Sequence, residues 1–346
     1  MELKIAEEPD RQHWDEIVDR SPNSTLFHRW KWLKLMEKYS TVNLAGFTSK
    51  ARLYPIILME KEKPVGIFPL FYFNHTLIKF CYSPCPRVET LYLGPLFPDI
   101  DIMKQEKKQI FLLEMQKEIE KFVKKDLAST FVEIDTAPGF DDGRFFKWGG
   151  YRVEPRYTYY IDLTIGTDQI WKGFNRSLRY YIEKAKKEGI IVTDGTKEDA
   201  LHIYDLLKER KRISSSKEFV GEVFDQFSPD HFKVFIAKAG SERLSGIMAI
   251  ADKDKVSFWV GAPRYNYKGL SPNELVLWES IRWASEMGYK TFEIEGAEDF
   301  SLFPFKRKFN GVIVLYTQMK WHSPLLRPFL CLYRTIKRDN ISLLNQ

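Results

Sequence analysis

Three cations lie between aromatic residues in the segment 303–309, which reads Phe-Pro-Phe-Lys-Arg-Lys-Phe. Upstream, the Ser-Pro-Asn-Glu sequence at 271–274 combines an N-cap residue, a proline at the first helical position and a glutamate at the third. This combination predicts a capping box and the start of a helix. Because helix N-termini and cationic loops both bind negatively charged groups, the stretch 269–311 predicts a site for an anionic ligand.

Hydrophobic spacing predicts the elements that position this site. Leu275, Trp278 and Ile281 recur at helical spacing until a glycine at 288 can end the helix. Phe292 and Ile294 then alternate with polar residues, as in a half-buried strand. A bend at 296–297 precedes the cationic segment, and a closing strand is predicted at 312–321. A helix N-terminus, a strand end and a cationic loop are thus expected to meet.

The same two periodicities predict an α/β protein over the rest of the chain. Helices are expected at 10–19, 27–39, 104–125, 168–187 and around 199–211. Strands are expected at 53–59, 65–73, 91–93, 131–135, 157–163, 232–239, 244–251 and 256–261.

The order of several segments indicates an internal repeat. Residues 66–70 parallel 246–250, residues 91–94 parallel 258–261, and residues 130–135 parallel 291–295. A Phe-Lys pair follows the last match in both halves, at 146–147 and at 305–306. We therefore expect two similar domains, 1–155 and 156–323, with a basic helical tail at 324–346 that packs on the first.

Composition narrows the class of protein. With 346 residues and 44% apolar content the chain can bury a large core, and its net charge of +6 mildly favours an anionic partner. Cys81, Cys85 and Cys331 are an odd number with no histidine beside them, which predicts neither a disulfide framework nor a metal site. No apolar run reaches the roughly 20 residues of a membrane-spanning helix. We expect a cytoplasmic protein, with a peripheral contact at the inner face of the membrane left open.

Three parts of the chain resemble the Fem-type (FemAB/FemX-like) aminoacyltransferases, which build peptidoglycan interpeptide bridges. They are a basic helix ending before a glycine at 171–189, the aromatic segments 151–153 and 157–159, and the stretch 271–309. The resemblance implies an α/β fold of two tandem GNAT-like domains with mixed, mostly antiparallel sheets. It also implies transfer of an aminoacyl group from aminoacyl-tRNA to an amine on a nucleotide- or lipid-linked peptide, with no bound cofactor or metal and no DNA partner.

The resemblance implies roles for individual residues. Lys306 matches a lysine at the aminoacyl-tRNA side of the family's channel and would stabilise the oxyanion of acyl transfer. Phe305 would stack on the terminal adenine of the donor, and Lys308 would contact the donor phosphates. On the acceptor side, Arg212 would pair with a diphosphate and Trp259 would face the acceptor. The alternatives are a solvated basic loop at 306–308, an exposed helix end at Arg212 and core packing for Trp259.

Two other functions remain open at this point. A GNAT N-acetyltransferase would hold the pyrophosphate of acyl-coenzyme A on the loop 264–269, which has the expected arginine and one of the expected glycines. A non-catalytic tandem-GNAT binding protein would not need Lys306. The acidic residues within and just after the predicted strand could serve as a general base, but we expect surface ion pairs from them. They are Glu293, Glu295, Glu298 and Asp299.

Overall fold

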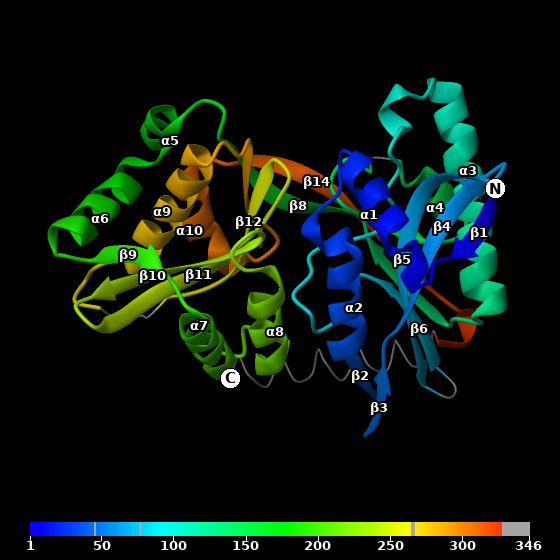
Figure 1. The fold of residues 1–346 in the computed structure, drawn as a ribbon, viewed down its shortest axis with the longest axis horizontal. Coiled ribbons are helices and arrows are strands. Elements are labelled where there is room, and N and C mark those ends of the chain that lie inside the picture. Colours follow the sequence, from blue (N-terminus) through cyan, green and yellow to red (C-terminus); the bar gives the residue numbers. More distant parts are fainter. Residues whose placement is uncertain (45, 76–77, 141, 264–266, 327–346) are drawn as a thin grey trace.

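The computed structural model describes residues 1–44, 46–75, 78–140, 142–263 and 267–326. Its first half contains four helices and a run of strands (Figure 1). The strands are β1 (Glu2–Ile5), β2 (Thr41–Leu44), β3 (Phe47–Lys50), β4 (Arg52–Glu60), β5 (Lys63–His75), β6 (Ile78–Ser83) and β7 (Phe131–Asp135). The helices are α1 (Arg11–Arg20), α2 (Trp30–Tyr39), α3 (Gln105–Lys121) and α4 (Arg144–Trp148).

The second half repeats this arrangement and adds a helix pair at its start. Its strands are β8 (Arg152–Asp162), β9 (Ile191–Asp194), β10 (Phe232–Ala239), β11 (Glu242–Asp252), β12 (Lys255–Pro263), β13 (Thr291–Ile294) and β14 (Val312–His322). Its helices are α5 (Thr167–Gly173), α6 (Arg176–Lys187), α7 (Lys197–Glu209), α8 (Lys217–Phe227), α9 (Pro272–Glu286) and α10 (Phe303–Lys306).

One mixed, mostly antiparallel sheet joins the two halves of the described chain. Its strand order is β1-β4-β5-β6-β7-β14-β8-β13-β12-β11-β10-β9, while β2 and β3 form a separate hairpin. Each half has a single parallel pair, β6 with β7 and β12 with β13. Since β7 and β13 occupy equivalent places, the predicted duplication is confirmed at the level of topology.

Helices cover both faces of this sheet. On one face, α1, α2, α7 and α8 share a continuous hydrophobic core that includes Trp32, Phe219 and Trp259 from both halves. On the other face, α3 and α4 cover the first half and α5, α6 and α9 the second. The shared core lies between α2 and α8, which stand side by side in Figure 1. The two halves are therefore packed directly against each other.

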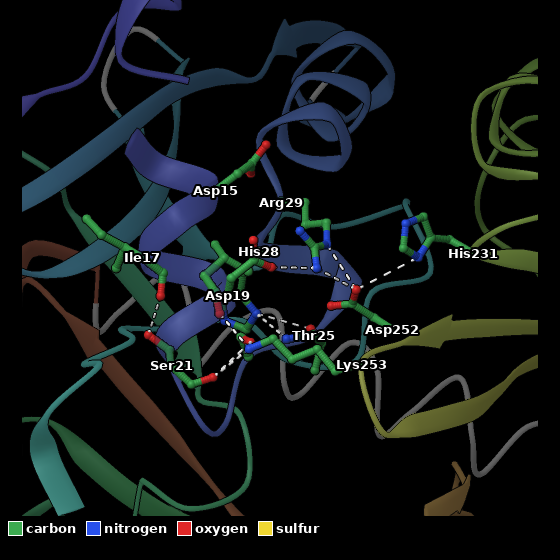
Figure 2. A network of polar contacts seen from close by, with 12 residues as sticks. Asp15, Ile17, Asp19, Ser21, Thr25, His28, Arg29, His231, Asp252 and Lys253 are labelled. Carbon is green, nitrogen blue, oxygen red and sulfur yellow. Dashed lines mark hydrogen bonds and ion pairs between the residues drawn. The ribbon is translucent and has the colours of Figure 1, made fainter. Parts of the chain in front are cut away.

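A polar network also crosses between the halves at the β11–β12 turn (Figure 2). The Arg29 guanidinium donates to the buried Asp252 carboxylate at 3.0 and 2.7 Å and pairs with Asp19 at 2.9 Å. Beside it, Lys253 donates to the Val18 and Ser21 carbonyls at 2.7 and 2.9 Å. These hydrogen bonds connect the turn between the end of β11 and the start of β12 to the N-terminal helices.

Several predicted elements need correction. The helix expected at 168–187 is two helices, because Asn175 caps a new helix by accepting from the Ser177 N–H at 2.8 Å. Residues 91–93 do not form a strand, and β6 is the counterpart of β12. The α9 helix starts where predicted, but the predicted capping box does not form. The Ser271 side chain makes no capping bond, and the Glu274 carboxylate accepts from the Lys308 ammonium at 3.4 Å.

Of the two predicted domain limits, one falls within a strand and the other just after one. The limit at 155 falls within β8, and β14 pairs with both β7 and β8. The expected tail begins with a short 3-10 turn, Pro324–Leu326, and its remainder from 327 lies outside the described residues. None of the described helices has the length and apolarity needed to cross a bilayer.

Candidate active site

The site begins where the two parallel strands β12 and β13 separate. Their pairing runs from Lys255 opposite Thr291 to Phe258 opposite Ile294 and then stops, although β12 continues. A register shift near Phe258 marks a bulge in β12. At the end of β13 the chain turns through Gly296, whose φ of 81° favours glycine. The split between the strands leaves room for side chains from the following segment.

Lys306 occupies this split. The short helix α10, which has a proline in its first turn, turns the Lys306 side chain inward, and only 4% of the residue is exposed. Its Nζ lies 5.6 Å from the centre of the Phe258 ring. A Cβ atom on Gly296 would lie 2.6 Å from this Nζ, so a side chain at this position would displace the end of the lysine.

Burial changes the protonation of Lys306. No hydrogen bond or ion pair joins its Nζ to another described residue, and desolvation lowers its pKa to about 8, partly offset by the charge of Glu295. At pH 7 roughly nine in ten molecules would still carry the ammonium. The site therefore holds a desolvated cation near a strand end, which is a suitable group for stabilising a developing oxyanion.

Two glutamates from β13 and its end complete the interior. Glu293 is fully buried and accepts four hydrogen bonds, from Tyr92 (2.6 Å), Thr158 (2.8 Å), Ser257 (3.0 Å) and Lys255 (3.1 Å). Tyr92 belongs to the first half, so both halves build this network. The ammonium of Lys255 is buried, which lowers its pKa, but the charge of Glu293 outweighs this and raises the pKa above its ordinary value.

Glu295 differs from Glu293 in its partners. Its Oε1 atom is buried and has no hydrogen-bond partner among the described residues. Desolvation and then repulsion from Glu293 raise the pKa of the Glu295 carboxyl well above its ordinary value. The expectation of four surface ion pairs is therefore wrong for Glu293 and Glu295, because the first half covers the face of β13 that periodicity assigned to solvent. The expectation of an ion pair is confirmed for Glu298, which pairs with Arg156 at 3.4 Å, and for Asp299, which pairs with Arg212 at 3.0 Å.

Arg212 lies at the same edge of the molecule as Lys306. It follows α7 and pairs with Asp299 at 3.0 Å, and half of its side chain is exposed. Asp299 in turn acts electrostatically on Lys306. The structure thus brings Arg212 next to the segment that carries Lys306, although the two are nearly a hundred residues apart in sequence.

Trp259 lies in the core between the halves. It is 3% exposed, and its indole N–H donates to the Glu89 carbonyl. Its ring packs edge-on against Trp32 (5.8 Å) and Phe232 (5.7 Å). This placement leaves no open ring face for an acceptor and agrees with the alternative of core packing.

Phe305 and Lys308, the residues predicted to bind the donor, both contact other side chains of the protein. Phe305 packs against Phe309 at 5.3 Å, and the Lys308 Nζ lies 3.4 Å from the Glu274 carboxylate. More exposed aromatic rings stand nearby at Phe300 (86% exposed) and Phe303 (46%). Sequence reasoning missed these two as binding residues. The available signal was that Phe303 belongs to the aromatic segment 303–309 and that Phe300 lies three residues before it.

Basic residues of α6 lie near the loop that precedes α9, and the structure describes only part of that loop. In α6, Arg176 is exposed and Arg179 is partly buried, and Lys184 donates to the Gly269 carbonyl at 3.3 Å. Of the loop 264–269 that an acyl-coenzyme A enzyme would use, residues 264–266 lie outside the described residues.

Comparison with known proteins agrees with this architecture. A family model described as an acetyltransferase (GNAT) domain matches residues 172–307. The crystal structure of FemX superposes with a TM-score of 0.69 at 16% identity, covering 94% of this chain and 99% of that one. L-PGS from Bacillus licheniformis gives 0.54 at 12% identity, covering 97% and 99%. A tandem GNAT protein from the clavulanic acid biosynthesis pathway gives 0.50 at 10% identity, covering 93% and 98%.

Curated protein sequences contain no match to this chain. At the identities of the solved structures, the likeness concerns the fold. The chain is thus an α/β protein of two tandem GNAT-like domains with a mixed, mostly antiparallel sheet, and its fold resembles that of FemX, as the sequence predicted.

Proposed function

We propose that the protein is a Fem-like acyltransferase that forms an amide between an aminoacyl group carried by tRNA and an amine on a nucleotide- or lipid-linked peptide. The observation that carries this proposal is the desolvated ammonium of Lys306 in the split between β12 and β13. In acyl transfer, negative charge develops on the carbonyl oxygen as the amine attacks. A cation already stripped of water stabilises that charge without further reorganisation of solvent.

The surroundings of Lys306 suit a nucleic-acid donor on one side. Phe300 and Phe303 offer exposed rings on which the terminal bases of a single-stranded end can stack. The Arg307 guanidinium lies 5.8 Å from the Phe303 ring and is available to phosphates. These residues support the aminoacyl end of tRNA as the donor, and they take over the role that the sequence suggested for Phe305 and Lys308.

The acceptor side rests on Arg212. A guanidinium can donate two parallel hydrogen bonds to a phosphate. The Arg212 guanidinium is half exposed and pairs with Asp299, in the segment between β13 and Lys306. A phosphate would have to replace Asp299, its present partner at 3.0 Å. A nucleotide- or lipid-linked peptide would then place its amine toward Lys306, in the cytoplasm or at the inner face of the membrane.

Transfer from acyl-coenzyme A is the second candidate. It is favoured by the match of residues 172–307 to an acetyltransferase domain model. The same Lys306 would then stabilise the oxyanion of a thioester, and the start of α9 would face the pyrophosphate.

A donor competition distinguishes the two candidates. The purified protein is incubated with aminoacyl-tRNA or with acyl-coenzyme A, together with a panel of peptide amines, and loss of each donor is measured. We expect consumption of aminoacyl-tRNA only, with binding that weakens steeply as salt rises, because every neutralised phosphate releases counterions. Consumption of acyl-coenzyme A with no affinity for tRNA would instead establish the second candidate, and inertness toward all donors would contradict both.

A further inference from the structure

The duplicated halves provide an internal comparison for the site. In the first half, β6 and β7 stop pairing at Ser83 opposite Ile134, as β12 and β13 stop at Phe258 opposite Ile294. The next residue is acidic in both halves, Asp135 and Glu295. A short helix with a Phe-Lys pair follows in each. The two strand ends therefore have the same arrangement of residues and can be compared position by position.

In the first half the acid and the lysine are not available for chemistry. Gln318, opposite Asp135 on β14, donates to the Asp135 carboxylate at 2.7 Å. The lysine that corresponds to Lys306 is Lys147, and it is exposed. The acid has a partner and the cation is in water, as expected of a structural position.

In the second half both features are reversed. The register of β8 and β13 places Tyr159 opposite Ile294, so Thr158 takes the place that Gln318 has in the first half. The Thr158 hydroxyl donates to Glu293 at 2.8 Å and leaves Glu295 without this bond. The Glu295 Oε1 atom is buried and unpartnered among the described residues, beside Gly296, against which the Lys306 Nζ packs.

From this difference, and on the premise of the proposed acyl transfer, we infer that Glu295 is the general base that takes the proton from the attacking amine while Lys306 holds the oxyanion. The amine nitrogen forms a bond to the carbonyl carbon of the ester, and the carbonyl electron pair moves to the oxygen beside Lys306. The nitrogen loses its proton to the Glu295 carboxylate. When the intermediate collapses, the bond to the sugar oxygen breaks and Glu295 returns the proton to that oxygen.

Glu293 cannot serve in this role. Its carboxylate already accepts four hydrogen bonds, one of them from the Lys255 ammonium, so it has no free direction toward a substrate. Glu295 is a stronger base, since burial and the neighbouring negative charge raise the pKa of its carboxyl. A base of this kind accepts a proton near neutral pH better than an ordinary carboxylate.

Charged groups on several elements set the titration of Glu295. Glu293 on the same strand and Glu89 of the first half favour its protonated form. Lys306 and Lys255 favour the ionised form. The rate should rise with pH as Glu295 loses its proton and fall again as Lys306 loses its own near pH 8, and the two limbs belong to the coupled pair.

The test compares Glu295→Gln with Asp135→Asn, its counterpart in the first half. Turnover is measured from pH 5.5 to 9 with an amine acceptor and with the same acceptor carrying an aminooxy group, which is neutral at pH 7. We expect Glu295→Gln to lose about 10²-fold or more in kcat with the amine and to lose the rising limb of the pH profile. With the aminooxy acceptor, which needs less help in losing a proton, the loss should be only a few-fold. Asp135→Asn should keep the wild-type profile.

The outcomes separate this inference from the proposed function. A wild-type enzyme that turns over while Glu295→Gln keeps its rising limb and its rate would overturn the role of Glu295 alone. An inert wild-type protein would overturn the proposed function and this inference together. A direct titration of the carboxyl by carbon NMR of glutamate-labelled protein adds an activity-free readout. A Glu295 that titrates near the ordinary value of about 4.3 would also overturn the inference.

Discussion

Replacing Lys306 with methionine removes a buried charge and keeps an unbranched apolar side chain of similar length. If the ammonium stabilises the oxyanion, the loss should resemble that of one preorganised oxyanion-hole donor, roughly 10²- to 10³-fold in kcat, or about 2.7 to 4 kcal/mol. The same charge has a cost for folding, because it is buried with no hydrogen bond or ion pair to another described residue. Activity and stability should therefore change in opposite directions.

The size and sign of the stability change follow from the pKa of Lys306, which burial lowers from 10.5 to about 8. Below pH 8 both the folded and the unfolded chain carry the proton, and the folded protein bears the full cost, on the order of 3 kcal/mol. Between pH 8 and 10.5 the folded protein releases the proton first, so this cost disappears as pH rises. Lys306→Met should be up to about 3 kcal/mol more stable than wild type at pH 7, with the difference closing toward pH 10.5.

Two assays check this prediction. Denaturant unfolding of both proteins at pH 7, 9 and 10.5 gives the difference in their free energies of unfolding. The contributions of the other titrating groups are the same in both proteins and cancel in this difference. Turnover at saturating donor and acceptor gives the loss in kcat. Lys147→Met, the exposed counterpart in the first half, should change neither quantity by more than a few-fold or about 0.5 kcal/mol. Equal turnover of Lys306→Met and wild type, or a stability difference that does not depend on pH, would refute the reasoning.

Two further predictions concern polar residues of the first half, the buried His28 and the partly buried Arg29 (Figure 2). His28 is fully buried, and desolvation lowers its pKa to about 3. Below pH 6.5 the histidine of the unfolded chain therefore binds a proton that the folded protein does not bind, which destabilises the folded state. Urea unfolding should show that wild type loses about 2 to 3 kcal/mol more stability than His28→Gln between pH 6.5 and 4.5. Identical pH slopes for the two proteins would contradict this. Arg29→Ala leaves the buried Asp252 carboxylate without its main partner and should cost about 3 to 5 kcal/mol of unfolding free energy. Arg282→Ala removes a half-exposed guanidinium from an ion pair on α9 and should cost under about 1 kcal/mol, so similar costs for the two variants would show that the Arg29 pair is not structurally important.

Local patterns were sufficient for the elements around the site. The strand alternation at 291–295 and the helical spacing from 272 predicted β13 and α9 with nearly the observed bounds, because each has one face in a core formed within its own half. The β14 strand was predicted for the same reason. The helix α8 was missed, although Ser216 caps it by accepting from the Phe219 N–H at 3.2 Å, because Gly221 interrupts its pattern.

The chemistry of the site was less accessible to sequence reasoning. The alternation of β13 assigned Glu293 to solvent, but donors distant in sequence cover this face, among them the Tyr92 hydroxyl from two hundred residues away. The burial of Lys306 depends in the same way on how α10 folds back over Gly296. Trp259 matched an acceptor position by resemblance, yet its ring is taken up by Trp32 and Phe232. Long-range packing decides all three positions.

The duplication also explains why one chain would hold one active site. Both halves end their parallel strand with an acid and continue into a Phe-Lys helix, but Gln318 donates a hydrogen bond to the first acid and Lys147 is exposed to water. The first half instead contributes Tyr92 to the Glu293 network, and its α2 helix packs on α8 of the second. Its role is then to cover the Glu293 network of the second half. Since the charge of Glu293 is one of the causes that raise the pKa of Glu295, a second half separated from the first would lose the Tyr92 hydrogen bond to a carboxylate on which the proposed chemistry depends.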